Sequence, residues 1–328
     1  MPTPPATASP QRETRNEKLE TEREAFLRDV IAGLSASPKS LPCKYFYDEI
    51  GSVLFDQITE TEEYYPTRME LAIMQAHVDE MAAQIGPGAV LVEYGSGSSL
   101  KTRVLLDHLG SLAAYVPIDI SGEHLFSVAE QLRAAYPDLP ILPVAADYTA
   151  AFDLPDLPAG KRVVYFPGST IGNFDEAQAA AFLDQAARIA EPGGGLLIGV
   201  DLKKDPAVLE AAYDDAAGVT SAFNLNLLDR INRELGGTFD RDRFAHRAVW
   251  NEDKSRIETY LVSLRDQTVE VDGKTFRFGE DEAMHTENSH KYTVEGFAAF
   301  AARHGLAVRQ CWTDPADLFS VQYFEVGA

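Results

Sequence analysis

The chain has 328 residues, which is long enough for one large domain or two smaller ones with a hydrophobic core. Its formal net charge of −22 argues against nucleic acid, an anionic membrane or a polyanionic substrate, because such partners require a basic surface. No apolar run approaches the roughly 18 to 20 residues of a membrane span, and the N-terminus has no signal-peptide pattern. We therefore expect a cytoplasmic protein.

The two cysteines, Cys43 and Cys311, are far apart and in no C-x-x-C pattern, so the sequence predicts neither a disulfide framework nor a metal site. Residues 1–15 are rich in Pro, Thr, Ala and Ser and are predicted to form a disordered tail. A helix is expected from about Asn16 to Leu34, and a second from Met69 to about Ile85.

A buried strand that runs into a glycine turn is the most informative local pattern. Val90–Val92 is the strand, Gly95 and Gly97 permit a sharp turn, and 102–109 reads as a helix. The third glycine of a dinucleotide fingerprint is replaced by Leu100, so a pyrophosphate is not favoured. Two acids near strand ends, Glu93 and Asp119, suit a ligand with a ribose and a cationic end, and S-adenosylmethionine meets both demands.

Strands and helices then alternate, which predicts an α/β fold with a doubly wound parallel sheet. The expected strands are 115–120, 141–146, 162–167 and 195–201, with helices such as 175–190 between them. Residues 204–291 interrupt the alternation with helical stretches at 208–217 and 223–235 and strand-like segments at 245–251, 257–264 and 267–278. A helix at 293–304 and two strands joined at Asp314-Pro315 close the chain, as in class I methyltransferases.

Four long motifs carry a resemblance to a known family. They are Y-F-Y-D-E-I-G-S-x-L-F-x-x-I-T-x-x-x-E-Y-Y-P-T-R-x-E, V-E-Y-G-S-G-S-S-L-K-T-R, F-P-G-S-T-I-G-N-F and H-T-E-N-S-H-K-Y. Together they resemble the L-histidine Nα-methyltransferases of ergothioneine biosynthesis, the EgtD family, from about Pro42 to the C-terminus. The resemblance implies trimethylation of histidine to hercynine with S-adenosylmethionine as the methyl donor, by a protein that we expect to be a monomer.

The resemblance also implies two domains and two groups of site residues. A discontinuous α+β substrate-binding domain would comprise 16–68 and 204–291, and a Rossmann-like methyltransferase domain would comprise 69–203 and 292–328. S-adenosylmethionine would contact Tyr47, Gly95, Ser96, Gly97, Lys101, Asp119, Asp147 and Tyr148. Histidine would contact Tyr64, Phe55, Gly168, Asn173, Tyr213, Thr259, Glu287 and Ser289, of which Tyr64 and Asn173 would hold the reacting end.

The chemistry of these side chains agrees with the implied roles. The Asn173 amide can donate to a carboxylate and accept from an amine. Glu287 and Ser289 would point the same way on a strand and could bind the two imidazole nitrogens, which discriminates against substrates without polar ring atoms. Thr259 departs from the family, because the members known best have methionine there, and a smaller polar residue at this position bears on pocket depth and substrate range.

Two alternatives remain open on the sequence alone. One is an N-methyltransferase of the same superfamily that acts on another amino acid or on a tryptophan-derived alkaloid precursor; Glu287 and Ser289 argue against indole, which offers one donor and no acceptor. The other is a non-catalytic protein that binds S-adenosylmethionine or an amino acid as a sensor. Such a sensor would bind both ligands without forming S-adenosylhomocysteine.

Overall fold

The computed structural model describes residues 10–96, 100–120, 122–147 and 152–327, with only the backbone for 10–20, 123 and 124. The described residues divide into two compact units, each discontinuous in sequence. Unit 1 is drawn from Met1–Glu62, Glu210–Val249 and Glu258–Glu287, and unit 2 from Glu63–Leu209, Trp250–Ile257 and Asn288–Ala328. Among the described helices, none has the length and apolar character of a membrane span.

Unit 2 is built on a seven-stranded sheet with the order β11-β12-β5-β4-β1-β2-β3. The first five strands are β1 (Val90–Tyr94), β2 (Ala114–Asp119), β3 (Val144–Ala145), β4 (Arg162–Phe166) and β5 (Gly195–Asp201), and they pair in parallel. The strands β11 (Leu306–Thr313) and β12 (Phe319–Val326) form an antiparallel hairpin, and β12 pairs antiparallel with β5. The predicted doubly wound sheet with its C-terminal hairpin is therefore confirmed.

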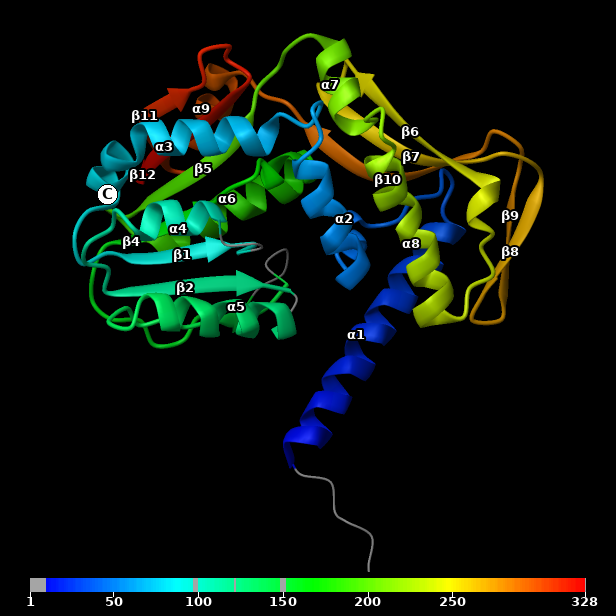
Figure 1. Cartoon of the computed structure of the whole chain (residues 1–328), viewed down its shortest axis with the longest axis horizontal. Helices are drawn as coiled ribbons and strands as arrows, with labels where there is room; N and C mark the ends of the chain where they lie inside the picture. The colour runs from blue at the N-terminus through cyan, green and yellow to red at the C-terminus, as the bar shows by residue number, and fades with distance from the viewer. Residues whose placement is uncertain (1–9, 97–99, 121, 148–151, 328) are drawn as a thin grey trace, which may run out of the picture. The chain divides into compact units, whose positions relative to one another are not determined.

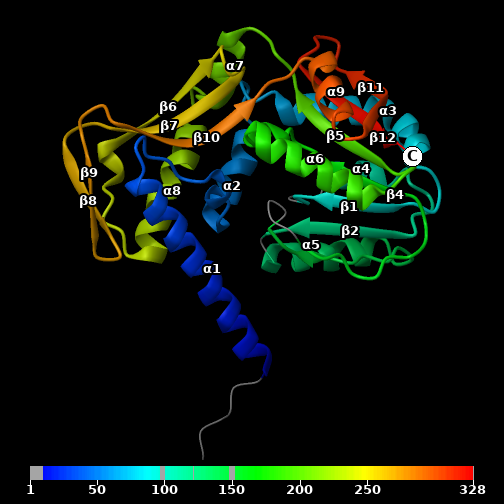
Figure 2. The same ribbon diagram turned by 180° about the vertical axis from the view of Figure 1, so that it is seen from behind.

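Helices cover both faces of this sheet. One face packs on α6 (Glu176–Ala190) and α9 (Val294–Ala302), which lie toward the viewer in Figure 2. The other face packs on α3 (Pro66–Ile85), α4 (Leu100–Leu106) and α5 (Gly122–Ala135), seen in front of the sheet in Figure 1. The sheet is thus buried on both sides, which explains the continuous apolar runs of its strands. The carboxyl ends of the parallel strands remain as the edge at which such folds bind ligands.

Unit 1 combines helices with a hairpin and with most of a small sheet, whose strands also include residues of unit 2. Its helices are α1 (Pro10–Ser35), α2 (Glu49–Thr59) and α8 (Val219–Leu235), with α7 (Pro206–Tyr213) divided between the units. A three-stranded sheet has the order β10-β7-β6, from β10 (Ala283–His290), β7 (Arg256–Ser263) and β6 (Phe244–Asn251). The remaining elements are the hairpin of β8 (Gln267–Val271) and β9 (Lys274–Phe278) and the short 3-10 helices η1 (Cys43–Phe46), η2 (Thr170–Asn173, in unit 2) and η3 (Arg241–Arg243).

Several boundaries differ from the sequence predictions for identifiable reasons. The helix α1 begins at Pro10, so residues 10–15, which were assigned to a disordered tail, are helical; Gln11, Arg12 and Glu13 are good helix formers. The strand β3 is only two residues long, because Pro143 lacks the N–H that a longer ladder needs. The segment 267–278 is a hairpin rather than one strand, because Asp272-Gly273, both with positive φ, forms a tight turn.

Candidate functional site

Apart from Tyr47, which belongs to unit 1, the predicted cofactor residues that the structure describes lie at the carboxyl edge of the sheet in unit 2. Gly95 follows β1 with φ 69°, and its N–H donates to the Ile118 carbonyl at 2.8 Å. Asp119 is the last residue of β2, and Asp147 follows β3 by two residues. Because β1, β2 and β3 are parallel neighbours, these positions share one edge, which suits a ribose-bearing ligand. Ser96 is buried there, whereas Gly97 and Tyr148 lie outside the described residues.

Glu93 does not take the ligand-facing position that the sequence suggested. Its side chain is buried, and it accepts hydrogen bonds from Thr102 on α4 (2.8 and 2.9 Å) and from the Tyr115 hydroxyl (2.7 Å). Burial raises the pKa of Glu93 to about 8, although these two hydroxyl groups lower it. The strand alternation explains the error, because Glu93 shares the α3/α4/α5 face of the sheet with Leu91.

Lys101, predicted to lie near the cofactor carboxylate, forms an ion pair with Glu70 of α3. The Glu70 side chain is only 1 % exposed, and its two oxygens also accept the Gly168 N–H at 3.0 and 2.9 Å. A Cβ on Gly168 would lie 3.7 Å from the Lys101 ammonium nitrogen. One buried carboxylate therefore contacts both a predicted cofactor residue and a predicted substrate residue.

The amino-acid side of unit 2 is organised around the loop 168–173. Gly168 has φ 82°, a conformation that favours glycine, and Asn173 ends the 3-10 helix η2. A Cβ on Gly172 would lie 2.8 Å from the His290 carbonyl oxygen and 3.5 Å from the Ser289 hydroxyl. The structure thus brings the Asn173 loop against Ser289, as predicted residues of one site require. Tyr64 is buried directly before α3 begins.

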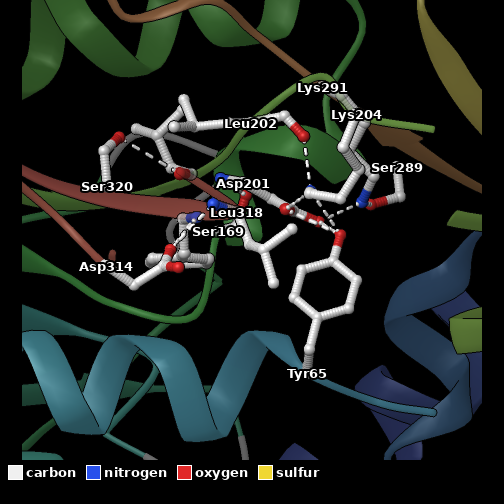
Figure 3. Close-up of polar contacts among 12 residues, drawn as sticks. Tyr65, Ser169, Asp201, Leu202, Lys204, Ser289, Lys291, Asp314, Leu318 and Ser320 are labelled. Atoms are coloured by element: carbon white, nitrogen blue, oxygen red, sulfur yellow. Dashed lines mark hydrogen bonds and ion pairs between the residues drawn. The ribbon is translucent and has the colours of Figure 1, made fainter. Parts of the chain in front are cut away.

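Figure 3 shows a buried polar cluster around Asp201 that the sequence analysis missed. The Asp201 carboxylate, at the end of β5, accepts from the Tyr65 hydroxyl at 2.8 Å, from Lys204 at 2.6 Å and from Lys291 at 2.7 Å. Burial raises the pKa of a carboxyl, but the charges of Lys291 and Lys204 outweigh burial and hold the pKa of Asp201 below its usual value. Burial also lowers the pKa of Lys204 to about 8.

This Asp201 cluster ties together neighbours of three predicted site residues. Tyr65 follows Tyr64. Ser169 follows Gly168, and its hydroxyl accepts the Asp201 N–H at 2.8 Å. Lys291 donates to the Ser289 hydroxyl at 2.7 Å. Residues 63–68, 204–209 and 288–291, which these contacts join, are part of unit 2. An acid at a strand end followed by two lysines, D-L-K-K, was the available signal.

In unit 1, two predicted pocket residues belong to an aromatic cluster. The rings of Tyr47 and Phe55 meet edge to face at 5.5 Å, and both pack on Phe223 of α8 at 5.6 and 6.0 Å. The carbonyl of Tyr213 accepts the Nε2–H of His246 at 2.8 Å, while His246 Nδ1 accepts from Asn224 at 2.8 Å. Burial lowers the pKa of His246, so the ring is neutral in this arrangement. His246 was not predicted from the sequence.

The predicted imidazole residues are on neighbouring strands of the three-stranded sheet. Glu287 lies on β10, where its charge adds to the effect of burial in raising the pKa of Cys43 to about 12. Thr259 on β7 is buried, and its hydroxyl is 3.0 Å from that of Thr286. Because Thr286 and Glu287 are adjacent in a strand, they point to opposite faces. Thr259 contacts Thr286 across the two strands, and its predicted place beside the imidazole stays a prediction.

Within the described part of the chain, no group of three or more His, Cys, Asp or Glu side chains has the arrangement of a metal site. The predicted histidine-binding residues are divided between the units. Unit 1 contains Phe55, Tyr213, Thr259 and Glu287, and unit 2 contains Tyr64, Gly168, Asn173 and Ser289.

Comparison with known proteins gives one family. The model described as "Histidine-specific methyltransferase, SAM-dependent" matches residues 26–326. The chain is 46 % identical to a histidine N-alpha-methyltransferase of Mycolicibacterium smegmatis over 91 % of this chain and 94 % of the relative. It is 44 % identical to the Mycobacterium tuberculosis enzyme of the same name, over 90 % and 94 %. Ergothioneine biosynthesis protein 1 of Neurospora crassa is 33 % identical over 84 % of this chain and 32 % of its own length.

Proposed function

Because the chain belongs to the family of histidine-specific, S-adenosylmethionine-dependent methyltransferases, we propose that it transfers three methyl groups to the α-amine of L-histidine and releases hercynine. The observation that carries the proposal is the near full-length family match, joined to the contact between the Asn173 loop and the Ser289 end of β10. We also propose that this is the first step of ergothioneine biosynthesis, as the name of the N. crassa relative suggests. We further propose that the protein is a cytoplasmic monomer that binds neither membranes nor nucleic acid.

The described residues at the carboxyl edge of the sheet fit S-adenosylmethionine. Gly95 leaves room for close approach, the Asp119 carboxylate can accept from both ribose hydroxyls, and Lys101 offers an ammonium for the cofactor carboxylate. When bound, the cofactor supplies a methyl group on an activated sulfonium. The protein therefore needs no strong acid catalyst, and its main tasks are alignment and exclusion of water.

On the acceptor side, we assign the substrate carboxylate to Tyr64, Tyr213 and Asn173, and the amine to Asn173 and the loop that begins at Gly168. The amine is largely protonated at neutral pH, so it must lose a proton before each of the three transfers. Glu287 and Ser289 would bind the imidazole, which offers one donor and one acceptor when neutral. An apolar ring would leave those two side chains unpaired, and this mismatch selects histidine.

The proposal is tested by mass spectrometry of a reaction that contains the protein, S-adenosylmethionine and a mixture of all common amino acids. Trimethylation of histidine alone is the expected result. Methylation of a different amino acid would refute the assigned substrate but not the cofactor. Binding of both ligands without S-adenosylhomocysteine would identify a sensor instead of an enzyme.

The substitution Glu287→Ala tests the imidazole assignment. We expect the KM for histidine to rise about tenfold to a hundredfold, because a hydrogen bond to a charged group contributes roughly 1.5–3 kcal/mol, while the affinity for S-adenosylmethionine changes little. Glu270→Ala, at an exposed position of β8 outside the predicted site, is the matched control. Equal losses in affinity for both ligands would contradict the assignment.

A further inference from the structure

A buried carboxylate, Glu70, lies between the two groups of predicted ligand residues in unit 2. It belongs to α3, its side chain is 1 % exposed, and it forms an ion pair with Lys101 of α4. The same carboxylate accepts the N–H of Gly168, the first residue of the substrate loop. Lys101 is assigned to the cofactor and Gly168 to the methyl acceptor, so Glu70 contacts both sides without being assigned to either.

The strand beneath Glu70 is adapted to its carboxylate. Gly199 is in the middle of β5, where every residue is buried, and a Cβ at this position would lie 2.2 Å from Glu70 Oε1. Glycine weakens a strand interior and commonly marks a place where another group approaches closely. The missing side chain at Gly199 is what allows Glu70 to reach Gly168 and Lys101 at once.

The charges favour one arrangement of these groups. A buried carboxylate needs a paired, hydrogen-bonded cation, and removal of that cation leaves its charge uncompensated; the Lys101 side chain that pairs with Glu70 is 17 % exposed. Glu70 therefore holds Lys101 beside Gly168. An ammonium group has three N–H donors, so Lys101 can bind Glu70 and also donate to the carboxylate of the cofactor. An anchored Lys101 fixes Glu70, and Glu70 in turn fixes the amide that begins the Asn173 loop.

We propose that Glu70 is a positioning residue that sets the amino-acid end of the bound cofactor and the methyl-acceptor loop 168–173 in one fixed relation. The inference rests on the proposed function for the identity of the two ligands. Its mechanistic consequence is that occupation of the cofactor side orders the acceptor side through Lys101, Glu70 and the Gly168 N–H. Methyl transfer benefits because donor and acceptor must be aligned closely, and a misplacement of 1 Å can lower the rate about a hundredfold.

The decisive measurement is hydrogen exchange of the peptide that covers Gly168–Asn173, with and without S-adenosylhomocysteine, in the full-length protein. We expect this ligand to slow exchange there about fivefold or more in the wild type, the range of a coupling of 1–3 kcal/mol, and to have almost no effect there in Glu70→Gln. Gln keeps the size and an acceptor oxygen but lacks the charge that holds Lys101. Equal slowing in both proteins, or none in the wild type, overturns the proposal.

Kinetics separate positioning from general destabilisation. In Glu70→Gln we expect kcat to fall about tenfold to a hundredfold, with a smaller change in the dissociation constant of S-adenosylhomocysteine. The matched control is Glu80→Gln on the same helix. The Glu80 carboxylate accepts from the Trp312 indole at 2.9 Å, and Glu80 lies near the other end of α3 from Glu70. A loss of kcat in Glu80→Gln as large as that in Glu70→Gln would refute a specific role for Glu70.

The variant Gly199→Ala provides a second, independent perturbation, because it displaces the Glu70 carboxylate without removing its charge. We expect it to abolish the ligand-dependent slowing at 168–173 as Glu70→Gln does; unchanged slowing in a folded Gly199→Ala protein counts against the proposal. Failure of the proposed function has a different signature. If the wild type binds S-adenosylhomocysteine but does not methylate histidine, the acceptor assignment fails, while the exchange experiment still decides the role of Glu70.

Discussion

Two carboxylates buried in unit 2, Asp201 and Glu93, have opposite protonation behaviour. Asp201 ends β5 and faces two lysines, whose charges overcome burial and keep its pKa low. Glu93 lies in β1 and faces the hydroxyls of Thr102 and Tyr115, and burial raises its pKa to about 8. Depth of burial does not distinguish the two side chains, since both are 1 % exposed. The difference therefore comes from the partners, because only a cation compensates a buried negative charge.

The comparison separates two uses of a buried acid. The ionised Asp201 attracts side chains from three places in the sequence and holds them at the end of a strand. Glu93 is mostly protonated at neutral pH, and it joins only a strand to the helix and strand beside it. An acid of the first kind fixes loops near a site, whereas an acid of the second kind completes local packing.

The largest effect is expected from Asp201→Asn. The variant leaves Lys204 and Lys291 without their carboxylate, and breaking a buried pair costs roughly 3–5 kcal/mol of unfolding free energy. Urea denaturation would measure the loss. Asp138→Asn, at an exposed position, is the control and should stay within about 0.5 kcal/mol. Similar stabilities of Asp201→Asn and wild type would show that the lysines find other partners.

A smaller effect of opposite sign is expected from Glu93→Gln. Between the usual pKa of 4.5 and the raised value of about 8, the folded protein binds a proton that the unfolded chain has lost, so this residue makes stability fall as the pH rises. From pH 4.5 to 7 the fall amounts to roughly 3 kcal/mol at about 1.4 kcal/mol per unit. The amide cannot ionise, so the stability of the variant relative to the wild type should increase over that range. A difference that is constant with pH would contradict a protonated Glu93.

The smallest effect concerns a third buried titratable group, His246 of unit 1. Its lowered pKa means that the unfolded chain binds a proton first as the pH falls below 6.5, so stability is lost in acid. In His246→Gln, the amide can donate to the Tyr213 carbonyl and accept from Asn224, as the neutral ring does. At pH 7 we expect the unfolding free energies of the variant and the wild type to agree within about 1 kcal/mol. Below pH 6.5 the unfolding free energy of the variant should fall less steeply as the pH decreases. If the unfolding free energies of both proteins fell equally with decreasing pH, groups other than His246 would be responsible for the loss of stability in acid.

The sequence predicts elements with strong local patterns and fails where a distant partner decides. The strand Gly195–Asp201 matches its prediction, because its apolar run and flanking glycines are local features. The two-residue β3 falls short of the prediction, since the effect of Pro143 on the ladder outweighs the apolar character of Ile141 and Leu142. Asp272-Gly273 was a recognisable turn signal that the sequence analysis did not use.

For the site, motif resemblance locates candidates but not their partners. Asn173 and Ser289 are distant in sequence, and only the fold shows that the loop of one contacts the other. Glu93 was expected to face a ligand, whereas strand alternation and its hydrogen bonds place it against α4 and β2. Glu70 was missed because a single acid in a helix has no local signature of its partners, and Asp201 was missed because the D-L-K-K signal was not used.

The glycine at position 199 also bears on transplantation of this site. A protein engineer who moves the 168–173 loop to another doubly wound scaffold would include Asn173. The loop lacks its support there unless Glu70, Lys101 and a glycine at the position of Gly199 in β5 are moved with it. These three positions lie on different elements, α3, α4 and β5, and must be transplanted together with the loop. In a scaffold with alanine at the equivalent of Gly199, the methyl group would occupy the place of the Glu70 carboxylate, and the transplanted loop would lack its hydrogen-bond acceptor.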